Sequence, residues 1–244
     1  MKILAFDSSN KALTVAVIED DILLTEQIIN IKRNHSLQLM PAIDEALKQA
    51  EVSLEELDCI AVAEGPGSYT GLRIAITVAK SLAWSKEIDL VGVSSLKVLA
   101  ANSMAKNKKM IVPLFDARRE NIYTGLYQWN ESEELETIEK DSHIAAKQWA
   151  SFLSEEYPNY MIELLGSDAK KFYPVFKEEL GDNVQLAAIN QHLPRASSLA
   201  FLARNEEPVE THHFIPSYLK LAEAEEDWLK EHPDSEGDKF VEKI

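Results

Sequence analysis

Hydrophobic and polar positions alternate along residues 4–18 and again along residues 113–127, a pattern that is typical of half-buried β-strands. Each block contains one strand-like run, a polar turn and a second strand-like run, and each is predicted to form a β-hairpin. Phe6-Asp7 aligns with Phe115-Asp116 without a gap. An aspartate therefore ends the first strand of both hairpins, which indicates an internal duplication.

The segments that follow the two hairpins support this duplication. After the first hairpin the pattern predicts a helix, a strand and a helix, at Ser36–Ala50, Asp58–Ala63 and Tyr69–Lys86. After the second it predicts the same order at Ile144–Glu156, Tyr160–Leu165 and Ala169–Glu179, then a strand at Val184–Ala188 and a helix at Ala196–Arg204. Two copies of one mixed unit predict an α/β protein with two related lobes, each opened by a β-hairpin. This layout is similar to the actin-like (ASKHA) fold of actin, hexokinase and Hsp70.

We therefore expect an N-terminal lobe at residues 1–104, a smaller C-terminal lobe at 105–222 and an acidic tail at 223–244. In proteins of the actin-like fold, the two hairpin turns face a cleft and hold the phosphates of a nucleotide. That resemblance makes Asp7, Ser8, Ser9, Asp116 and Arg118 candidates for the lining of a cleft. Alternatively, the two aspartates are turn residues whose carboxylates accept hydrogen bonds from nearby backbone N–H groups.

The stretch AEGPGSYTGLR, residues 63–73, joins a predicted strand to the Tyr69–Lys86 helix. Its spacing fails the rules for a phosphate loop, a dinucleotide loop and a nucleophile elbow. Gly65 and Gly67 provide a sharp turn, and Ser68 is placed to cap the helix that follows. A helix N-terminus also accepts anions, so the same three residues are candidates for contact with a nucleotide. We predict no catalytic residue here.

The two helices of the N-terminal lobe, Ser36–Ala50 and Tyr69–Lys86, carry more apolar surface than one sheet face can cover. This surplus predicts a subunit interface. The predicted interface residues are Leu39, Met40, Ile43, Leu47, Leu72, Ile76, Ala79 and Ala83. An ordinary core in which both helices are fully covered within one lobe is the alternative.

Composition narrows the classes of function. The chain has 25 Lys plus Arg against 41 Asp plus Glu, a formal net charge of −16, which disfavours contact with a nucleic-acid backbone. Its six histidines and one cysteine contain no pair at a metal-ligand spacing, so no metal is expected. Cys59 lies within an apolar run and is expected to be buried. The single cysteine and the lack of a membrane-length apolar run predict a cytoplasmic protein.

Several motifs together resemble one known family. They include ILAFDSSNKALTVAVIEDD, NHSLQLMPAIDEAL, AEGPGSYTGLRIAITVAKSLAW, GVSSLKVLA, PLFDARRENIYTGLY and PSYLKLAEAE. In this order they are similar to the bacterial TsaB family, also called YeaZ, from Met1 to about Glu225. The resemblance implies the actin-like fold and a dimer contact through the two helices of the N-terminal lobe. It also implies weak ATP or ADP binding at most, and no other cofactor.

The resemblance further implies a role in tRNA threonylcarbamoyladenosine modification without chemistry of its own. Members of this family pair with TsaD, a paralogue that transfers threonylcarbamoyl to tRNA, and the ATPase TsaE joins them. They are homodimers in isolation and meet tRNA only through the complex. TsaD binds a metal through an H-x-x-x-H motif, whereas the corresponding Ser94–Val98 segment here has no histidine. Two alternatives stay open, a small-molecule kinase of the same fold and an M22-type peptidase.

Overall fold

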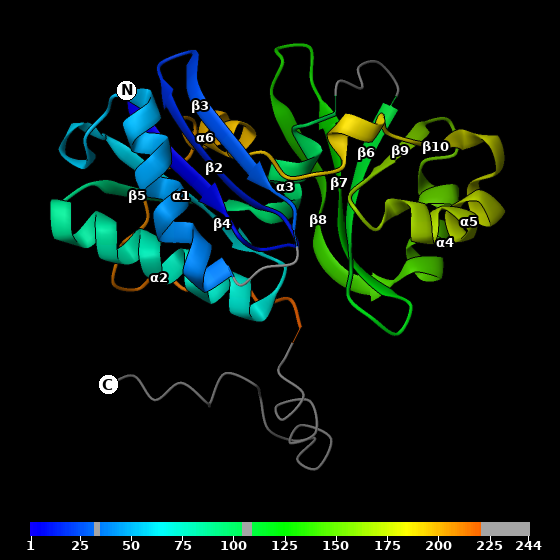
Figure 1. Ribbon diagram of the computed structural model, residues 1–244. Helices are drawn as coiled ribbons and strands as arrows, with labels where there is room; N and C mark the ends of the chain where they lie inside the picture. Colours follow the sequence, from blue (N-terminus) through cyan, green and yellow to red (C-terminus); the bar gives the residue numbers. More distant parts are fainter. Residues whose placement is uncertain (32–34, 104–108, 221–244) are drawn as a thin grey trace.

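Two five-stranded mixed sheets, one in each lobe, form the framework of the protein (Figure 1). The computed structural model describes residues 1–31, 35–103 and 109–220. The first sheet has the order β3-β2-β1-β4-β5, with β1 at Lys2–Asp7, β2 at Leu13–Glu19, β3 at Ile22–Ile29, β4 at Cys59–Gly65 and β5 at Asp89–Ser94. The second has the order β10-β9-β6-β7-β8, with β6 at Lys109–Asp116, β7 at Asn121–Trp129, β8 at Leu135–Ala145, β9 at Met161–Leu165 and β10 at Val184–Leu186.

The two sheets have the same topology. In the first, β1 pairs antiparallel with β2 and parallel with β4; in the second, β6 pairs antiparallel with β7 and parallel with β9. Phe6-Asp7 ends β1 and Phe115-Asp116 ends β6, as the sequence alignment predicts. The predicted duplication and the α/β fold with two related lobes are confirmed.

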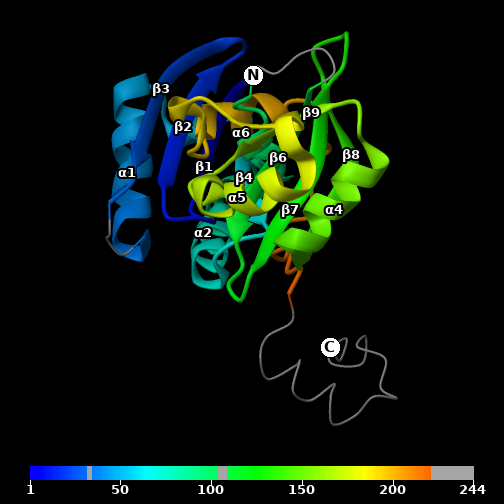
Figure 2. The same cartoon turned by 90° about the vertical axis from the view of Figure 1, so that its right-hand side faces the viewer.

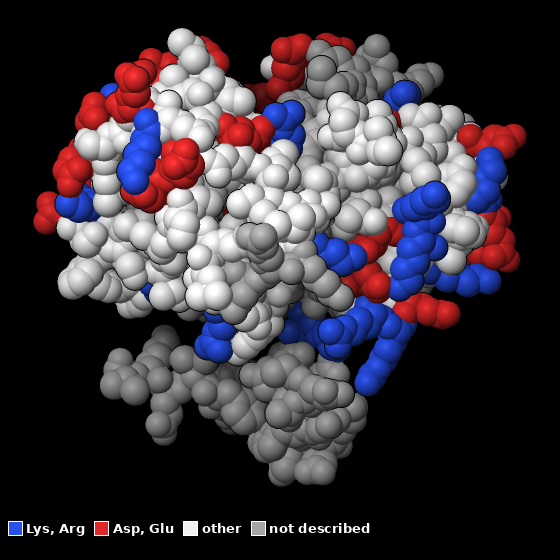
Figure 3. Space-filling model, in the orientation of Figure 1, with Lys and Arg blue, Asp and Glu red and all other residues white. Residues whose placement is uncertain are grey.

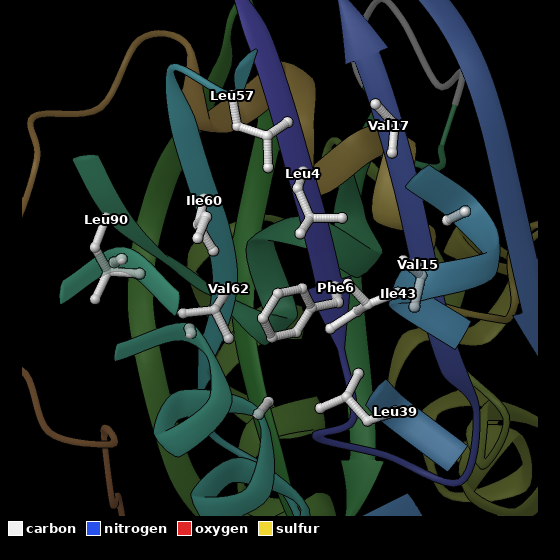
Figure 4. Packing of buried hydrophobic residues seen from close by; sticks show 14 of the residues in the cluster. Leu4, Phe6, Val15, Val17, Leu39, Ile43, Leu57, Ile60, Val62 and Leu90 are labelled. Atoms are coloured by element: carbon white, nitrogen blue, oxygen red, sulfur yellow. The ribbon is translucent and has the colours of Figure 1, made fainter. Parts of the chain in front are cut away.

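Helices cover both faces of the first sheet (Figures 1 and 2). Side chains alternate along β1, so Leu4 and Phe6 point to the face covered by α1 (His35–Ala50) and α2 (Tyr69–Lys86), as Figure 4 shows. Ile3 and Ala5 point to the opposite face, which is covered by α6 (Ala196–Ala203). Cys59 is buried on that face, as expected, and its burial raises the pKa of the thiol to about 12. Burial of both faces explains the nearly continuous apolar sequence of β1 and β4.

The second sheet is covered on one face by α4 (Ala146–Glu156) and α5 (Ala169–Leu180). Its other face meets the short helix α3 (Ser95–Ala100), which belongs to the N-terminal lobe (Figure 1). Leu96 and Leu99 of α3 pack with Ile111, Phe115 and Tyr127 of the second sheet. We call this group the interlobe cluster. It joins the two lobes through apolar contact.

The predicted boundaries of the C-terminal lobe are wrong. Residues 105–222 include α6, but Leu199 and Ala200 of α6 pack against Ile3 and Ala16 of the first sheet. The chain therefore returns to the N-terminal lobe before the described part ends, because that sheet still has an uncovered apolar face to bury. The predicted tail at residues 223–244 lies outside the described residues. Within the described residues, no helix is both long and apolar enough to cross a membrane.

Candidate functional site

The first group of candidate cleft residues lies at the buried start of the β1–β2 turn. Asp7, Ser8 and Ser9 have at most 1% of their surface exposed. The carboxylate of Asp7 accepts a hydrogen bond from the backbone N–H of Ser9 over 2.6 Å. Burial raises the pKa of Asp7, although the hydrogen bonds from Ser9 oppose this shift. These three residues therefore do not line an open cleft, which corrects the sequence-based expectation.

The glycine-rich stretch is what covers this turn. The N–H of Ser68 donates to the carbonyl of Ser9 over 2.7 Å, and Ser8 Oγ donates to the carbonyl of Gly71 over 2.8 Å. A Cβ atom on Gly67 would lie 2.3 Å from the Ser9 carbonyl oxygen, and one on Gly71 would lie 2.0 Å from that of Ser8. Glycine at both positions is needed for this close backbone approach.

Ser68 has the capping role that the sequence predicts. Its side chain accepts a hydrogen bond from the N–H of Gly71 over 3.3 Å at the start of α2. Gly65 is buried and Gly67 is half-buried, whereas Ser68 is exposed. The space beside the first hairpin turn is therefore occupied by the backbone of the protein itself, an arrangement that suits a structural role for this stretch.

The second hairpin turn lies at the surface, between the lobes. Asp116 Oδ1 accepts a hydrogen bond from the N–H of Arg118 over 2.9 Å, and Asp116 Oδ2 lies 2.5 Å from Lys171 Nζ. Partial burial alone would raise the pKa of Asp116, but the bonds from Lys171 and Arg118 outweigh it and lower the pKa. Asp168 accepts from the N–H of Asp116 over 3.2 Å and from Lys11 Nζ over 3.0 Å. An ion pair between Lys11 and Asp168 therefore links the two turns.

The backbone after Asp116 is unusual. Arg118, Arg119 and Glu120 have φ angles of 68°, 49° and 63°, which place three consecutive non-glycine residues in the left-handed region. Each such residue costs on the order of 1 kcal/mol. This turn exposes Arg118 to solvent. The structure therefore brings Asp116 and Arg118 together at the surface, whereas Asp7 is buried in the first turn.

A half-buried carboxylate between the lobes was not predicted from the sequence. Asp141 of β8 accepts hydrogen bonds from Ser94 Oγ, over 2.5 Å, and from the hydroxyl of Tyr127. Burial raises the pKa of Asp141, although these two bonds oppose the shift. Burial also raises the pKa of Glu64, and the charge of Asp141 adds to that effect. A Cβ on Gly125 would lie 2.6 Å from Asp141 Oδ1, so this glycine makes room for the carboxylate.

No pattern in the sequence indicates this group, because Asp141 belongs to an acidic run that looks like a solvated surface. In the structure an irregularity in the pairing of β7 with β8 lies beside it, between Thr124 and Leu126. Such bulges re-aim side chains at sheet edges. Among the described residues, no group of three or more His, Cys, Asp or Glu side chains is arranged to hold a metal ion.

Most of the predicted interface residues are core residues instead. Six of the eight are buried in the N-terminal lobe: Leu39, Ile43, Leu72, Ile76, Ala79 and Ala83. Figure 4 shows Leu39 and Ile43 directed toward Phe6, on the covered face of the sheet. The prediction placed them outward because the helix pattern alone does not reveal which apolar stripe faces the sheet. Met40 is exposed and Leu47 is half-buried, so these two remain available to a partner.

The helices nevertheless present a further apolar surface. Leu37, Met40 and Trp84 are 74%, 46% and 66% exposed. Other members are only partly buried, namely Leu47, Ile74, Val78 and Leu82. We call these seven residues the α1–α2 face. In Figure 3 the surface over α2 and the adjoining end of α1 is largely free of charged side chains.

A groove of about 460 Å³ runs beside the α1–α2 face. Its apolar lining comes from both helices and from the segment after α1, through Met40, Ile43, Leu47, Val52, Leu54 and Leu82. Asp44 and Lys48 stand at its edge and form an ion pair with each other over 2.6 Å. The groove is a recess beside the face that a complementary side chain of a partner can fill.

Comparison with known proteins gives this geometry a context. The family profile described as TsaD, tRNA N6-adenosine threonylcarbamoyltransferase, matches residues 23–228. The tRNA threonylcarbamoyladenosine biosynthesis protein TsaB of Bacillus subtilis (strain 168) is 40% identical over 230 residues, which cover 94% of this chain and 99% of that protein. The protein of the same name from Escherichia coli (strain K12) is 32% identical, over 57% of this chain and 63% of that protein.

Solved structures agree with the sequence relatives. YeaZ from Pseudomonas aeruginosa matches with a TM-score of 0.75 and 27% identity, over 89% of this chain and 99% of that one. The ROK hexokinase from Thermus thermophilus matches with a TM-score of 0.50 and 11% identity, over 84% of this chain and 98% of that one, which shows the actin-like fold alone. This chain belongs to the TsaB family of tRNA threonylcarbamoyladenosine biosynthesis proteins.

Proposed function

We propose that this chain is a non-catalytic subunit that pairs with a TsaD homologue and activates it, with the ATPase TsaE joining the pair. The partner transfers threonylcarbamoyl from threonylcarbamoyl-AMP to N6 of the adenosine next to the anticodon, in tRNAs that read codons beginning with A. This chain contributes a binding surface, and the partner contributes the chemistry.

The main support for this proposal is the exposure of the α1–α2 face. Leu37, Met40 and Trp84 are exposed on a chain with a net charge of −16, where solubility alone would favour charged side chains at these positions. Apolar residues on two neighbouring helices, with a groove beside them, have the character of a core that is completed by a second chain. We propose the same face for the homodimer of the isolated chain.

The packing of the first hairpin turn supports a role without nucleotide chemistry. A phosphate held at that turn would need the space in which Gly67 and Gly71 touch Ser9 and Ser8. We therefore propose that the chain needs no cofactor and binds ATP or ADP weakly at most. Titration with Mg-ATP by calorimetry tests this: tight stoichiometric binding would favour the kinase alternative.

The pairing is tested by co-purification of the full chain with the TsaD homologue of the same cell, using Met40→Glu and Trp84→Glu variants. Each change places a charge on the α1–α2 face, and burying an unpaired charge costs several kcal/mol. We expect both variants to lose the partner and to keep their circular dichroism spectrum, because the exposed side chain still reaches water in the free chain.

Ile189→Glu is the matched control, because Ile189 is 93% exposed and lies in the C-terminal lobe. It should co-purify like the unmodified chain. The proposal fails if the unmodified chain does not bind the TsaD homologue, or if the two α1–α2 variants bind it as well as Ile189→Glu does.

A further inference from the structure

The segment at residues 209–218, near the end of the described chain, runs back along the N-terminal lobe (orange in Figure 1). We call it the strap. The N–H of Val209 donates to the carbonyl of Leu90 over 2.8 Å, and the N–H of Ser217 donates to the carbonyl of Glu64 over 2.8 Å. Between these two anchors Phe214 is 8% exposed and packs with the core of the lobe. The strap is therefore an integral part of this lobe.

Helix α2 and two glycines hold the strap in place. Lys80 Nζ donates to the carbonyls of His212 and Phe214, over 3.0 and 2.8 Å. A Cβ on Gly65 would lie 2.6 Å from the carbonyl oxygen of Ser217, and one on Gly92 would lie 2.6 Å from the ring of Phe214. A side chain at either glycine would push the strap away, so the sequence specifies this docked position.

The docked strap completes an aromatic surface at the start of α2. The rings of Tyr69 and Tyr218 stack with their centroids 5.1 Å apart. The guanidinium carbon of Arg73 lies 4.8 Å from the centroid of the Tyr69 ring, and Arg73 donates to the Tyr69 hydroxyl over 2.7 Å. Tyr69 and Tyr218 nevertheless remain 53% and 44% exposed. We call these three residues the ledge.

The ledge and Trp84 of the α1–α2 face lie on the same side of α2, because Arg73 and Trp84 are about three helical turns apart. At that end of α2 the ring of Trp84 meets His212 of the strap at 6.1 Å. Tyrosine, tryptophan and arginine are the residue types that dominate binding energy at interfaces. Here they are held in place before any partner arrives, which lowers the conformational entropy lost on binding.

We propose that the ledge of Tyr69, Arg73 and Tyr218 is a second contact for the TsaD homologue, in which the partner lays an apolar or aromatic side chain on the tyrosine rings and a carboxylate against Arg73. This inference rests on the proposed function. A second copy of this chain fits the ledge less well, because two ledges facing each other would bring two Arg73 guanidinium groups together.

Calorimetry with the TsaD homologue and the full chain tests the ledge. We expect Tyr218→Ala to weaken binding at least tenfold, because it removes half of the stack. Tyr218→Phe keeps the ring and should bind within twofold of the unmodified chain. Ile189→Ala, which removes an exposed apolar side chain far from the ledge, should also bind within twofold.

Hydrogen exchange at the N–H of Ser217 separates contact from anchoring. If Tyr218→Ala loses affinity while that N–H stays protected, the ledge touches the partner. If protection is lost as well, the effect comes from release of the strap, and the inference is overturned. It is also overturned if Tyr218→Ala binds normally while Met40→Glu does not bind, a result that leaves the proposed function intact. If both variants bind normally, both proposals fail.

Discussion

Ser94, at the end of β5 in the N-terminal lobe, donates a hydrogen bond to Asp141 of β8 in the C-terminal lobe, with 2.5 Å between Oγ and Oδ2. The same Ser94 oxygen accepts hydrogen bonds from the N–H groups of Leu96 and Lys97, so one hydroxyl caps α3 and joins the lobes. The interlobe cluster lies next to this contact, since Tyr127 belongs to both. Apolar packing and the hydrogen bonds of a half-buried carboxylate thus hold the lobes together.

The carboxylate of Asp141 gives a prediction about how the stability of the protein depends on pH. The pKa of Asp141 is raised by burial, so the folded state binds its proton more tightly than the unfolded chain does. Its contribution to stability is then complete below the unfolded pKa of about 4 and is lost as pH rises through the folded pKa. We expect Asp141→Asn, which cannot ionise, to gain stability relative to the unmodified protein between about pH 4 and pH 8.

Urea unfolding at several pH values measures this difference. Glu64 strengthens the expected trend, because its own raised pKa moves toward the ordinary value when the charge of Asp141 is removed. Asp182→Asn is the control, since Asp182 is exposed and its pKa is lowered by Lys177. A stability difference for Asp141→Asn that is constant across this pH range would contradict the prediction.

A second prediction concerns the close approach of the glycine-rich stretch to the first hairpin. Gly71→Ala places a methyl group 2.0 Å from the backbone oxygen of Ser8, and backbone cannot yield as a side chain can. We expect a loss of about 3 kcal/mol, at the upper end of the range for overpacking. Gly181→Ala is the comparison, because Gly181 has φ of +57° but no neighbour within 4 Å.

Gly181→Ala should cost only about 1 to 2 kcal/mol, from backbone strain alone, because φ of 57° with ψ of −124° is a conformation that non-glycine residues rarely adopt. Thermal or chemical unfolding of the two variants provides the test. Equal losses would mean that the contact between Gly71 and Ser8 is not a constraint on folding.

The sequence predicted those elements that are amphipathic or bounded by clear turns. The range of α2 was predicted without error, and α1, α4, α5 and α6 were placed within two residues at each end. Both hairpins were found because the aspartates at positions 7 and 116 mark the ends of their first strands. The cap at Ser68 was also correct.

The elements that were not predicted are those that depend on contacts between segments distant in the sequence. Helix α3 is short and buried between two sheets, so it has no polar stripe to give a helical period. Strand β8 contains several acidic residues of a run that looks like a loop, and its pairing with β7 is interrupted by bulges. The outward stripe of α2 could not be separated from its core stripe until the sheet was in place, and the strap has no pattern of its own.

The distinction between core and surface stripes is itself testable. Leu39 and Ile76 are 1% and 3% exposed, so Leu39→Glu and Ile76→Glu would bury a charge without a partner. We expect each to cost 4 kcal/mol or more, roughly, and to unfold the N-terminal lobe. Circular dichroism measures the loss of helical structure, and light scattering measures the oligomeric state. If either variant is a folded monomer, that residue belongs to the subunit interface and not to the core.

The net charge of the chain also predicts that it binds RNA weakly when isolated. With 41 Asp plus Glu against 25 Lys plus Arg, a net charge of −16, the chain repels the phosphate backbone. We expect gel shifts at physiological salt to show no binding of tRNA by the isolated chain at micromolar concentration. The complex with the TsaD homologue should bind tRNA under the same conditions. Micromolar binding by the chain alone would overturn this expectation.

The final prediction compares a buried ion pair with an exposed one. The side chain of Glu26 is 7% exposed and accepts hydrogen bonds from Arg195 and Ser197 at the start of α6. Burial alone would raise the pKa of Glu26, but these bonds outweigh it and lower the pKa. Removal of Arg195 would leave a buried carboxylate with an incomplete set of partners. We expect Arg195→Ala to cost about 2 to 3 kcal/mol, less than for a fully enclosed pair because Arg195 is half exposed.

Lys48→Ala is the matched control, since both Lys48 and its partner Asp44 are more than 60% exposed, and it should cost less than about 0.5 kcal/mol. The pH dependence gives a second readout. Because the pKa of Glu26 is lowered on folding, its contribution is present above the unfolded pKa and is lost as pH falls through the folded value. The stability difference between the unmodified protein and Arg195→Ala should therefore narrow from about pH 6 to about pH 3. If the difference widens as pH falls, Glu26 does not carry the charge that this pairing requires.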